Sequence, residues 1–436
     1  MAKVIPFRAL RYNTAKIEDL SLVTTPPYDI ISPDEQEAFY KAHPANVIRL
    51  EYGKTYDADT DANNRYTRAA ADLKAFIDEQ LLITEEQPAF YLYEEIFTLK
   101  GGEVKSFKGF MGLTELAEFS EKIVLPHEET LSKAKTDRFN LMQTTGANFS
   151  QIYCLYMDPE RKLTAIIDRE SAKSPDICFK TADGITHRLW IIKDEKTCAE
   201  ITDGFAGKQL FIADGHHRYE TALNFRNKCR AESNSADGAP YDYVMMMLVE
   251  MDDPGLVVFP THRMLKNLAS FDEAEALEKI SRNFDAEKTA AAGNVSEQIE
   301  NSLKASGDKC VFAFYTGGDY FYKLTLRDPE VMKTAAAGKT AAYAALDVSV
   351  LHTLILRDIF GIDTDKLANQ TNLVYTRLAD EAVSAVSDGS FTCSFLLNAT
   401  KVRQIKDVSL ANDKMPQKST YFYPKIITGL VMNKFM

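Results

Sequence analysis

The stretch LFIADGHHRYETAL, residues 210–223, places two adjacent histidines between a glycine and an arginine. The residues before Asp214 are apolar, as in a short buried strand, and those after Gly215 have the composition of a helix. Because neighbouring side chains of a strand or a helix point in different directions, His216 and His217 cannot both face a core. The stretch therefore predicts a strand, a tight turn and a helix, with at least one histidine presented to another group.

The predicted turn has the chemistry of an anion site. It brings the N-terminus of a helix, with its backbone N–H groups and positive dipole end, to the end of a strand. Gly215 allows a ligand close to the backbone. His216, His217 and Arg218 add side-chain donors, so we expect a bound phosphate. The plainer alternative is that Asp214 caps the helix and the basic residues lie on a solvated first turn.

The composition of the chain restricts the classes of function. The sequence has 436 residues and is 45% hydrophobic, which is enough for a sizeable core and about two or three domains. The formal net charge of −12 argues against a general nucleic-acid-binding protein, because phosphate backbones are bound through clustered Lys and Arg. A local basic site for a small phosphorylated ligand is compatible with this charge.

Targeting and redox signals favour the cytoplasm. The six cysteines are scattered without a CxxC pair, so we expect buried thiols in a reducing compartment and neither disulfides nor a zinc ribbon. The N-terminal residues MAKVIPFRALRYN lack the apolar segment of a signal peptide. No stretch reaches the roughly 18 apolar residues of a membrane span, since the nearest, AALDVSVLHTLIL, contains Asp347 and His352. We therefore expect a cytoplasmic protein without a membrane partner.

Local signals along the chain predict an α+β protein with mixed, largely antiparallel sheets. Ser32, Pro33 and Glu35 form a helix start, with Ser as N-cap and Glu in the capping-box position. Alternating hydrophobic segments on both sides of residues 100–103 and of residues 317–319 predict two β-hairpins.

The character of the sequence changes near residue 268, where Ala-rich helical segments begin. We expect a nucleotide-binding catalytic region at residues 1–267 and an α+β C-terminal region at residues 268–436. The aromatic run Tyr421, Phe422 and Tyr423 favours packing of the last segment onto the core, so this segment is expected to return to the site.

A second candidate segment is PHEETLSKAKTDR, residues 126–138. A carboxylate of Glu128 or Glu129 beside His127 could orient a hydroxyl nucleophile or bind a magnesium ion. The cationic residues that follow could bind phosphate or a carboxylate: Lys133, Lys135 and Arg138. The alternative is a charged loop that leads into a solvated helix face.

Two further segments carry basic residues near expected strand ends. FPTHRML contains His262 and Arg263, and MPQKSTYFYPK contains Lys418 before two hydroxyl residues. The second segment suits phosphate, but it lacks the glycine-rich lead-in of a P-loop ATPase. A third His-Arg pair, His187 and Arg188, is interpreted as a sheet-surface pair.

The combination of these segments resembles a widespread prokaryotic family of about this length, which is catalogued as a domain of unknown function. The resemblance rests on the segments PPYDII, HPANVIRLEYG, PHEETLSKAKTDR, ITHRLW, IADGHHRYETAL, FPTHRML and MPQKSTYFYPK. It runs along nearly the whole chain and brings no activity with it.

The strand, turn and helix are also similar to the phosphate-binding turn of the ParB/sulfiredoxin-like fold, in which Gly-x-His-Arg follows a strand. That superfamily includes sulfiredoxins, domains of partition proteins and free-serine kinases. The resemblance implies phosphate contacts by four residues: Gly215, His216, His217 and Arg218. Sulfiredoxins carry a catalytic Cys in this turn, where the present chain has His216, so the free-serine kinases match better.

These observations predict a nucleotide-dependent phosphotransferase of the kinase type that acts on a small hydroxylated metabolite, with free serine as the first candidate. Its cofactor would be ATP or ADP with Mg²⁺. One alternative is a metal-dependent hydrolase, in which zinc or manganese would be bound by a set of four residues: His127, Glu128, His216 and His217. Adjacent histidines rarely converge on one ion, which weakens this alternative. The other is a ParB-like ligand-sensing or nucleic-acid-binding regulator, against which the acidic composition counts.

The predicted site residues fall into three groups. The candidate catalytic residues are Glu128, Asp214 and His217. The candidate nucleotide-binding residues are Gly215, His216, His217, Arg218, Arg263 and Lys418. The candidate substrate-binding residues are His127, Lys135 and Arg138. We further expect Glu128, His217 and Arg263 to line one cleft, with Lys418 at its rim.

Overall fold

The structure, a computed structural model of the chain, describes residues 2–130, 132–233, 238–291, 293–363, 366 and 371–436, without the side chains of residues 132–134. The described residues form two compact units. Unit 1 comprises the chain up to Pro126, Thr130–Leu256 and Pro424–Met436, and unit 2 comprises His127–Glu129 and Val257–Tyr423. The assignment of a catalytic region to residues 1–267 and of an α+β region to residues 268–436 stays a prediction.

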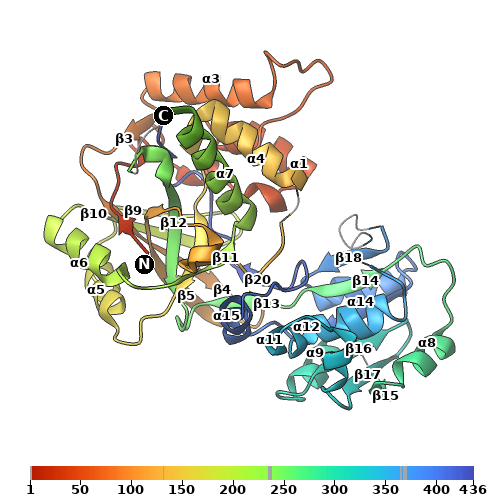
Figure 1. Cartoon of the computed structure of the whole chain (residues 1–436). Helices are drawn as coiled ribbons and strands as arrows, with labels where there is room; N and C mark the ends of the chain where they lie inside the picture. Colours follow the sequence, from red (N-terminus) through yellow and green to blue (C-terminus); the bar gives the residue numbers. More distant parts are fainter. Residues whose placement is uncertain (1, 131, 234–237, 292, 364–365, 367–370) are drawn as a thin grey trace. The chain divides into compact units, whose positions relative to one another are not determined.

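Unit 1 is built on a large mixed sheet (Figure 1). Its strand order is β6 (Val124–Leu125), β11 (Leu210–Asp214), β8 (Ile152–Tyr156), β12 (Tyr243–Glu250), β5 (Val104–Glu115), β4 (Phe90–Thr98), β10 (Thr186–Ile192) and β9 (Ile177–Lys180), and β1 (Val4–Ile5) also pairs with β5. The pairs β6–β11 and β8–β12 are parallel, and the other described pairs of this sheet are antiparallel. The mixed, largely antiparallel sheets and the α+β class are therefore confirmed.

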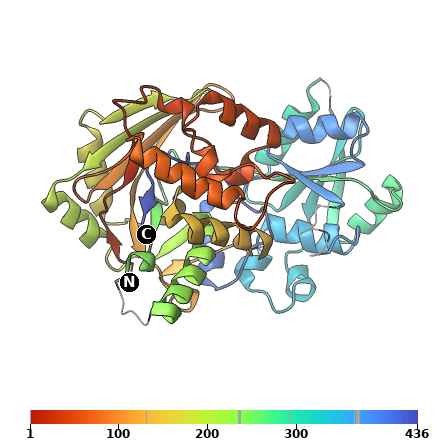
Figure 2. The ribbon, with the colours of Figure 1, turned by 90° about the horizontal axis from the view of Figure 1, so that it is seen from above.

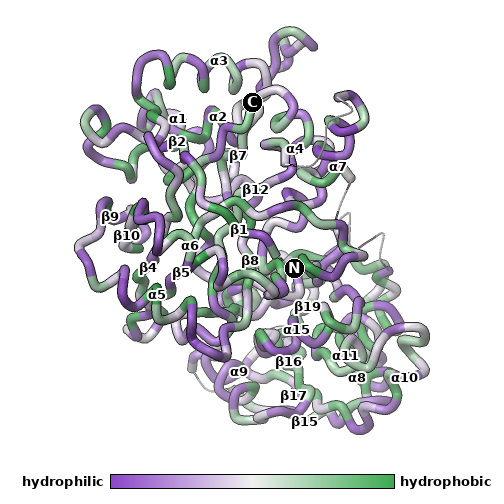
Figure 3. The backbone as a smooth tube through the Cα atoms, turned by 60° about the vertical axis from the view of Figure 1, so that its left-hand side comes forward, coloured by the Kyte–Doolittle hydropathy of each residue, from purple (hydrophilic) through white to green (hydrophobic). Residues whose placement is uncertain are grey.

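Helices pack against this sheet through its apolar side chains. The helices α3 (Arg65–Asp78), α4 (Ser132–Thr145) and α7 (His216–Ser233) lie side by side (Figures 1 and 2), and α5 (Lys162–Ser171) packs on α6 (Glu195–Phe205). Alternate residues of β8 and β12 form one buried cluster with residues of α4, α5, α6 and α7: Ile152, Cys154, Tyr156, Val244, Met246 and Leu248. Figure 3 shows hydrophobic colouring near β1. The register of the core strands is thus set by which alternate residues are apolar.

Shorter elements complete unit 1: β2 (Leu10–Tyr12), η1 (Leu20–Leu22), η2 (Tyr28–Ile30), α1 (Pro33–Ala42), α2 (Ile48–Glu51), β3 (Leu82–Thr84), η3 (Phe119–Glu121), β7 (Ala147–Asn148), η4 (Pro240–Asp242) and β21 (Asn433–Lys434). The predicted start of α1 is confirmed, because the Ser32 hydroxyl accepts from the Glu35 backbone N–H and the Glu35 carboxylate accepts from the Ser32 backbone N–H. The predicted hairpin at residues 100–103 joins β4 and β5.

Unit 2 contains an antiparallel sheet with the strand order β15 (Phe284–Ala290), β17 (Tyr320–Leu326), β16 (Val311–Tyr315), β19 (Cys393–Leu397), β14 (His262–Leu265) and β18 (Leu373–Thr376). The pair β13 (Val257–Phe259) and β20 (Tyr421–Tyr423) is separate from it. The helices are α8 (Glu273–Ile280), α9 (Val295–Lys304), α10 (Val331–Ala335), α11 (Ala341–Ala344), α12 (Asp347–Val350), the π-helix η5 (Leu351–Arg357), α14 (Ala379–Ser387) and α15 (Val402–Leu410). The predicted hairpin at residues 317–319 joins β16 and β17.

Two local expectations need correction. Cys154, Cys198 and Cys393 are buried as expected, but Cys229 and Cys310 are only half-buried and Cys178 is exposed, so the buried-thiol interpretation is wrong for Cys178. His187 was interpreted as part of a sheet-surface pair, but its side chain is fully buried, because β9 and β4 flank its strand and Phe179 stacks on its ring. No helix in the described part of the chain is long and apolar enough to cross a membrane.

Candidate functional site

The motif at residues 214–218 forms a strand, a turn and a helix in unit 1. The strand β11 ends at Asp214, Gly215 has a φ of 93°, and α7 begins at His216 and continues for 18 residues. His216 is buried and His217 is half-buried, so the two adjacent side chains lie in different environments. The local geometry is therefore the one that the sequence predicts.

The Asp214 carboxylate accepts hydrogen bonds from two cationic side chains at this turn. Its Oδ2 accepts a hydrogen bond from Arg218 Nη2 at 2.7 Å, and its Oδ1 accepts one from Lys425 Nζ. Arg218 Nη1 also donates to the backbone carbonyl of Gln151 at 2.6 Å. Two side-chain cations thus share one carboxylate at the N-terminal end of α7.

The ionisation of Asp214 follows from these contacts. Burial alone would raise the pKa of the Asp214 carboxyl, but Lys425 and Arg218 outweigh burial and hold this pKa well below its ordinary value. A carboxylate that is ionised and has both oxygens in ion pairs is a weak proton acceptor. The contacts therefore fit a role in positioning Arg218 and Lys425 better than the predicted catalytic role of Asp214.

Gly215 is needed for two reasons. Its φ of 93° lies in the region that side-chain-bearing residues rarely adopt. A Cβ at this position would also lie 2.9 Å from Arg218 Nη2 and 3.0 Å from Arg218 Nε. The absence of a side chain at residue 215 is what allows the guanidinium to lie against the turn.

Arg138, a predicted substrate-binding residue, is buried in unit 1. Its Nε donates to Asp137 Oδ2 at 2.8 Å, its Nη1 donates to the Glu51 carbonyl at 2.9 Å, and its guanidinium lies 3.9 Å from the centre of the Tyr28 ring. Arg138 and Arg218 both line a cavity of about 30 Å³, which is large enough for about one water molecule. The donors of Arg138 thus bind groups of the protein, and its role in substrate binding stays a prediction.

Lys135, the second predicted cationic substrate ligand, is paired with a residue of α7. Its Nζ lies 2.8 Å from Glu220 Oε2, and the Thr130 hydroxyl donates to the same oxygen at 2.7 Å. The side chain of Lys133 lies outside the described residues. Lys135 is therefore held beside the second turn of α7, and its role in substrate binding stays a prediction.

Unit 2 brings together four of the other predicted site residues. The His127 carbonyl accepts from the Met415 N–H at 2.7 Å, and His127 Nε2 lies 3.1 Å from Thr420 Oγ1. Glu128 Oε1 accepts from the Lys418 backbone N–H at 3.1 Å, and Lys418 has a φ of 57°. The segment 127–129 thus runs beside residues 415–420 and holds their turn.

Arg263 completes this cluster from its buried position on β14. It is 1% exposed, and it donates to the Lys418 carbonyl at 3.2 Å, to His352 Nε2 at 3.2 Å and to the Thr261 carbonyl. Burial lowers the pKa of Arg263 to about 10. Its guanidinium is thus enclosed by protein acceptors, and its role in phosphate binding stays a prediction.

The four residues of the expected cleft belong to two different units, and the structure describes each unit by itself. Glu128, Arg263 and Lys418 lie together in unit 2, whereas His217 lies in unit 1, so a joint cleft stays a prediction. Sequence reasoning missed Lys425, the second cation on Asp214. Its only local signal was its position directly after Pro424, at the end of the segment that was expected to return to the site.

Metal ligands do not gather in the part of the chain that the structure describes. Among these residues, no group of three His, Cys, Asp or Glu side chains has the arrangement of a metal site. The predicted zinc or manganese set of the hydrolase alternative draws on both units, since His127 and Glu128 belong to unit 2 and His216 and His217 to unit 1. No described geometry therefore favours this alternative.

Residues 4–349 match the family described as "Protein of unknown function (DUF1015)". The chain belongs to the DUF1015 family. The match covers both the turn at residues 214–218 and the segment 126–138, and it confirms the resemblance to a family of unknown function. A comparison with curated proteins gave no significant match to this DUF1015 chain.

Several solved structures are weakly similar to the DUF1015 chain. A conserved hypothetical protein from Pyrococcus furiosus is 14% identical with a TM-score of 0.32, and the alignment covers 71% of this chain and 90% of that one. A free serine kinase in complex with AMP is 14% identical with a TM-score of 0.34, over 77% of this chain and 95% of that one. SbnI with a C-terminal truncation, from Staphylococcus aureus, is 10% identical with a TM-score of 0.35, over 74% and 87%. At these scores the function must be argued from the residues of the site.

Proposed function

We propose that this DUF1015 chain is a nucleotide-dependent phosphotransferase that binds the phosphates of ATP or ADP at the turn between β11 and α7. The observation that carries the proposal is the shared carboxylate, because Arg218 and Lys425 both pair with Asp214 in front of an 18-residue helix. A helix N-terminus favours an anion, and two cationic side chains fixed beside it add to that preference.

The turn offers a preorganised cradle for a phosphate group. Asp214 fixes the two cations, so they lose little conformational freedom when a phosphate binds. Gly215 leaves the backbone open to close approach, and the half-buried His217 follows it on the first turn of α7. Because phosphoryl transfer depends mainly on positioning and charge stabilisation, fixed cations at the phosphates supply the part of catalysis that a protein most needs to provide.

Magnesium fits this turn poorly as a protein-bound ion. Asp214 is the carboxylate of the turn, and both of its oxygens already accept from cations. A divalent ion prefers several free oxygen ligands, which the described turn does not offer. We therefore derive no step through Mg²⁺ and propose that any Mg²⁺ is carried in on the nucleotide.

The proposed acceptor is a small hydroxylated metabolite, with free serine as the first candidate from the resemblance of the turn. A general base would take the hydroxyl proton as the phosphoryl group is transferred. With Asp214 neutralised by two cations, the candidates that remain are His217 and Glu128. Glu128 is half-buried and accepts the Lys418 N–H through Oε1, which a glutamine oxygen can also do.

Nucleotide binding tests the cradle directly. Isothermal titration with ATP and ADP should give binding to the parent protein, and Arg218→Ala and Lys425→Met should each weaken it about tenfold or more, the loss expected for one charge-assisted contact. Arg169→Ala is the matched control, because Arg169 is a half-exposed arginine on α5 with its own partner, Glu200. If no adenine or guanine nucleotide binds at millimolar concentration, or if both variants bind as well as the parent, the cradle is ruled out.

Turnover tests the reaction. The protein with ATP or ADP, Mg²⁺ and L-serine should form O-phosphoserine, detected by mass spectrometry, with homoserine, threonine and glycerate as competing acceptors. Glu128→Gln should lose most turnover and keep nucleotide affinity if Glu128 is the base, because the change removes a proton acceptor and keeps the contact with Lys418. Phosphorylation of another acceptor would correct the substrate. Hydrolysis of a phosphoester by the zinc- or manganese-loaded protein, with no kinase product, would replace the proposal by the hydrolase.

A further inference from the structure

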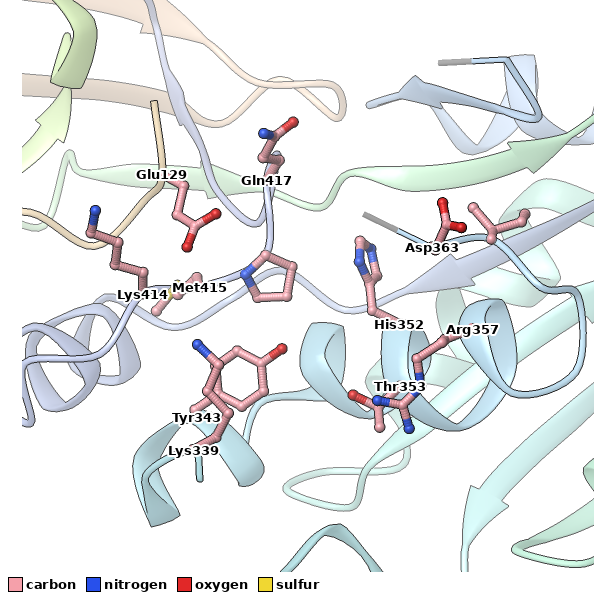
Figure 4. A pocket seen from close by; sticks show the side chains of 12 residues that line it. Glu129, Lys339, Tyr343, His352, Thr353, Arg357, Asp363, Lys414, Met415 and Gln417 are labelled. Carbon is pink, nitrogen blue, oxygen red and sulfur yellow. The ribbon is translucent and has the colours of Figure 1, made fainter. Parts of the chain in front are cut away.

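Unit 2 contains a pocket of about 280 Å³ that the proposed reaction does not use. Its walls come from the segment 414–417, from the π-helix η5, from α11 and from Glu129 (Figure 4). Most of its lining residues have polar or charged side chains, among them His352, Thr353 and Lys414. The volume suits a small metabolite.

The π-helix sets the spacing of one wall. In a π-helix the hydrogen bonds run from residue i+5 to residue i, a rare pattern that is frequent at functional sites. The segment Leu351–Arg357 has this form, and His352, Thr353 and Arg357 from it all reach the pocket. Figure 4 shows the His352 ring rising from the helix between Gln417 on one side and Asp363 on the other.

The hydrogen bonds of His352 determine which ring nitrogen carries its proton. Arg263 Nε, which can only donate, lies 3.2 Å from His352 Nε2, so Nε2 is the acceptor. Burial lowers the pKa of His352 well below its ordinary value, so the ring is neutral. In a neutral ring with an accepting Nε2, the proton lies on Nδ1.

The Nδ1–H group of His352 has no acceptor among the described residues. His352 is 6% exposed, and its Nδ1 is a buried atom without a hydrogen-bond partner. A buried donor without an acceptor costs about 1–3 kcal/mol, so such groups in proteins almost always have a partner. A lone pair of a ligand in the pocket that His352 lines would supply one.

The charges of the lining favour an anion at this donor. Three cations line the pocket, of which Lys339 is paired with Asp413 and Arg357 with Asp358, whereas the Lys414 ammonium has no ion pair within the described residues. Two carboxylates, those of Glu129 and Asp363, also reach it. Both are exposed, so water screens them more than it screens the enclosed histidine.

We propose that this pocket binds a small metabolite through an oxyanion group, a carboxylate or a phosphate ester, whose oxygen accepts the His352 Nδ1–H and whose charge is balanced by Lys414. The site lies within unit 2 and is independent of the nucleotide cradle of unit 1. Arg263 acts as a positioning residue in this arrangement, because it fixes the tautomer of the ring and does not itself line the pocket.

Titration calorimetry on the full chain, with malonate and inorganic phosphate as probes of the two oxyanion types, tests this proposal. One of the two should bind, and Lys414→Met should weaken that binding about tenfold. The matched control is Lys279→Met, an α8 lysine that lies outside the pocket and is paired with Glu275. Because phosphate would also bind the proposed cradle, the titrations are repeated in an Arg218→Ala background.

These titrations distinguish binding at the unit 2 pocket from binding at the proposed cradle of unit 1. Loss of oxyanion binding in Lys414→Met with ATP binding unchanged supports the pocket, and this result stands whether or not the cradle binds nucleotide. No binding of either probe in the Arg218→Ala background, or equal binding by Lys414→Met, overturns the pocket proposal.

A second measurement determines the tautomer of the His352 ring in the unmodified protein. In protein labelled with ¹⁵N-histidine, long-range proton–nitrogen spectra distinguish the two neutral tautomers. We expect the His352 signal of the Nδ1–H tautomer, and we expect its Nδ1 resonance to shift when the bound probe is added. A proton on Nε2, or an Nδ1 resonance that does not respond to a probe that binds, overturns the proposal.

Discussion

Asp214 organises a basic site although it is itself an acid. Its two oxygens each hold one cation, and Arg218 joins the end of β11 to the carbonyl of Gln151. The same three side chains therefore stabilise the fold and shape the proposed cradle. Arg218 was identified from the sequence because it follows Gly215 on the first turn of the predicted helix. Lys425 lies 211 residues from Asp214 in the sequence. It could not be identified in the same way, because a local sequence pattern does not show which distant residues pair.

Asp214→Asn should destabilise unit 1, because Arg218 and Lys425 would remain buried without their counter-charge. Breaking a buried pair costs about 3–5 kcal/mol, so the midpoint of urea unfolding should fall markedly. Asp57→Asn is the control, since Asp57 is exposed. Equal midpoints for the two variants would show that the Asp214 ion pairs do not stabilise unit 1.

A second buried carboxyl, Glu95, makes stability depend on pH. Tyr93 donates to Glu95 Oε1 at 2.7 Å, and burial raises the pKa of Glu95 to about 8. The folded state then holds a proton that the unfolded state has lost, so stability present at low pH is lost as pH rises toward 8. His187, whose pKa burial lowers to about 4, acts in the opposite direction, but only below its ordinary value of 6.5.

Glu95→Gln should remove this dependence above pH 6.5, where His187 no longer titrates. Between pH 6.5 and 8 the parent should lose stability on the order of 1 kcal/mol per pH unit, and the variant should stay nearly level. Urea unfolding at several pH values measures both slopes. Glu103→Gln, at an exposed hairpin position, should keep the slope of the parent. A parent without this slope would contradict a protonated Glu95.

At the scale of elements, the features that the sequence predicted are those with local causes. The capping box of α1 and the turns of both hairpins depend on residues within four positions of one another. The π-helix at Leu351–Arg357 was not predicted, because its apolar residues read equally well as an ordinary helix.

One close approach between elements rests on a single glycine. Gly255 lies where the chain leaves β12, and a Cβ there would be 1.9 Å from the Ser106 carbonyl oxygen of β5. The clashing atoms are backbone atoms, so neither side can yield without moving a strand. At Gly53, by contrast, a Cβ would be no closer than 3.4 Å to its neighbours.

Gly255→Ala should therefore lower the stability of unit 1 by about 1–3 kcal/mol or more, the cost of overpacking. Gly53→Ala is the matched control and should change stability little. Chemical unfolding of both variants gives the comparison, and hydrogen exchange should show lost protection in β5 near Ser106. A Gly255→Ala protein as stable as the control would mean that the segment moves freely.

At the scale of the molecule, the last residues of the chain complete the first unit. Met432 exchanges backbone hydrogen bonds with Leu10, and β21 pairs with β7. The sequence indicated that the end of the chain returns to the core through its aromatic run, but the start of unit 2 near Val257 left no compositional mark there. The composition changes near residue 268 because Ala-rich helical segments begin there. Unit 2 instead begins with β13, which pairs with β20 of the same unit.

Removal of residues 424–436 should weaken unit 1 and abolish nucleotide binding, because it deletes Lys425 and the partner strand of β7. Hydrogen exchange followed by mass spectrometry should show faster exchange at Leu10 and in β7. Exchange in β16 and β19, which pair within unit 2, should stay slow and serves as the internal control. Unchanged protection at Leu10 would contradict this account.

Because residues 424–436 belong to unit 1, the order of synthesis matters for this chain. During translation, every residue of unit 2 leaves the ribosome before Lys425 does, and domains generally fold as they emerge. All of unit 2 therefore emerges before Lys425 does, while the N-terminal part of unit 1 still lacks the partners of β7 and Leu10. The turn at Asp214 gains its second cation only when the last dozen or so residues are free. A chain that ends before residue 425 thus cannot assemble the proposed phosphate cradle, so nucleotide binding would report that this segment has been made.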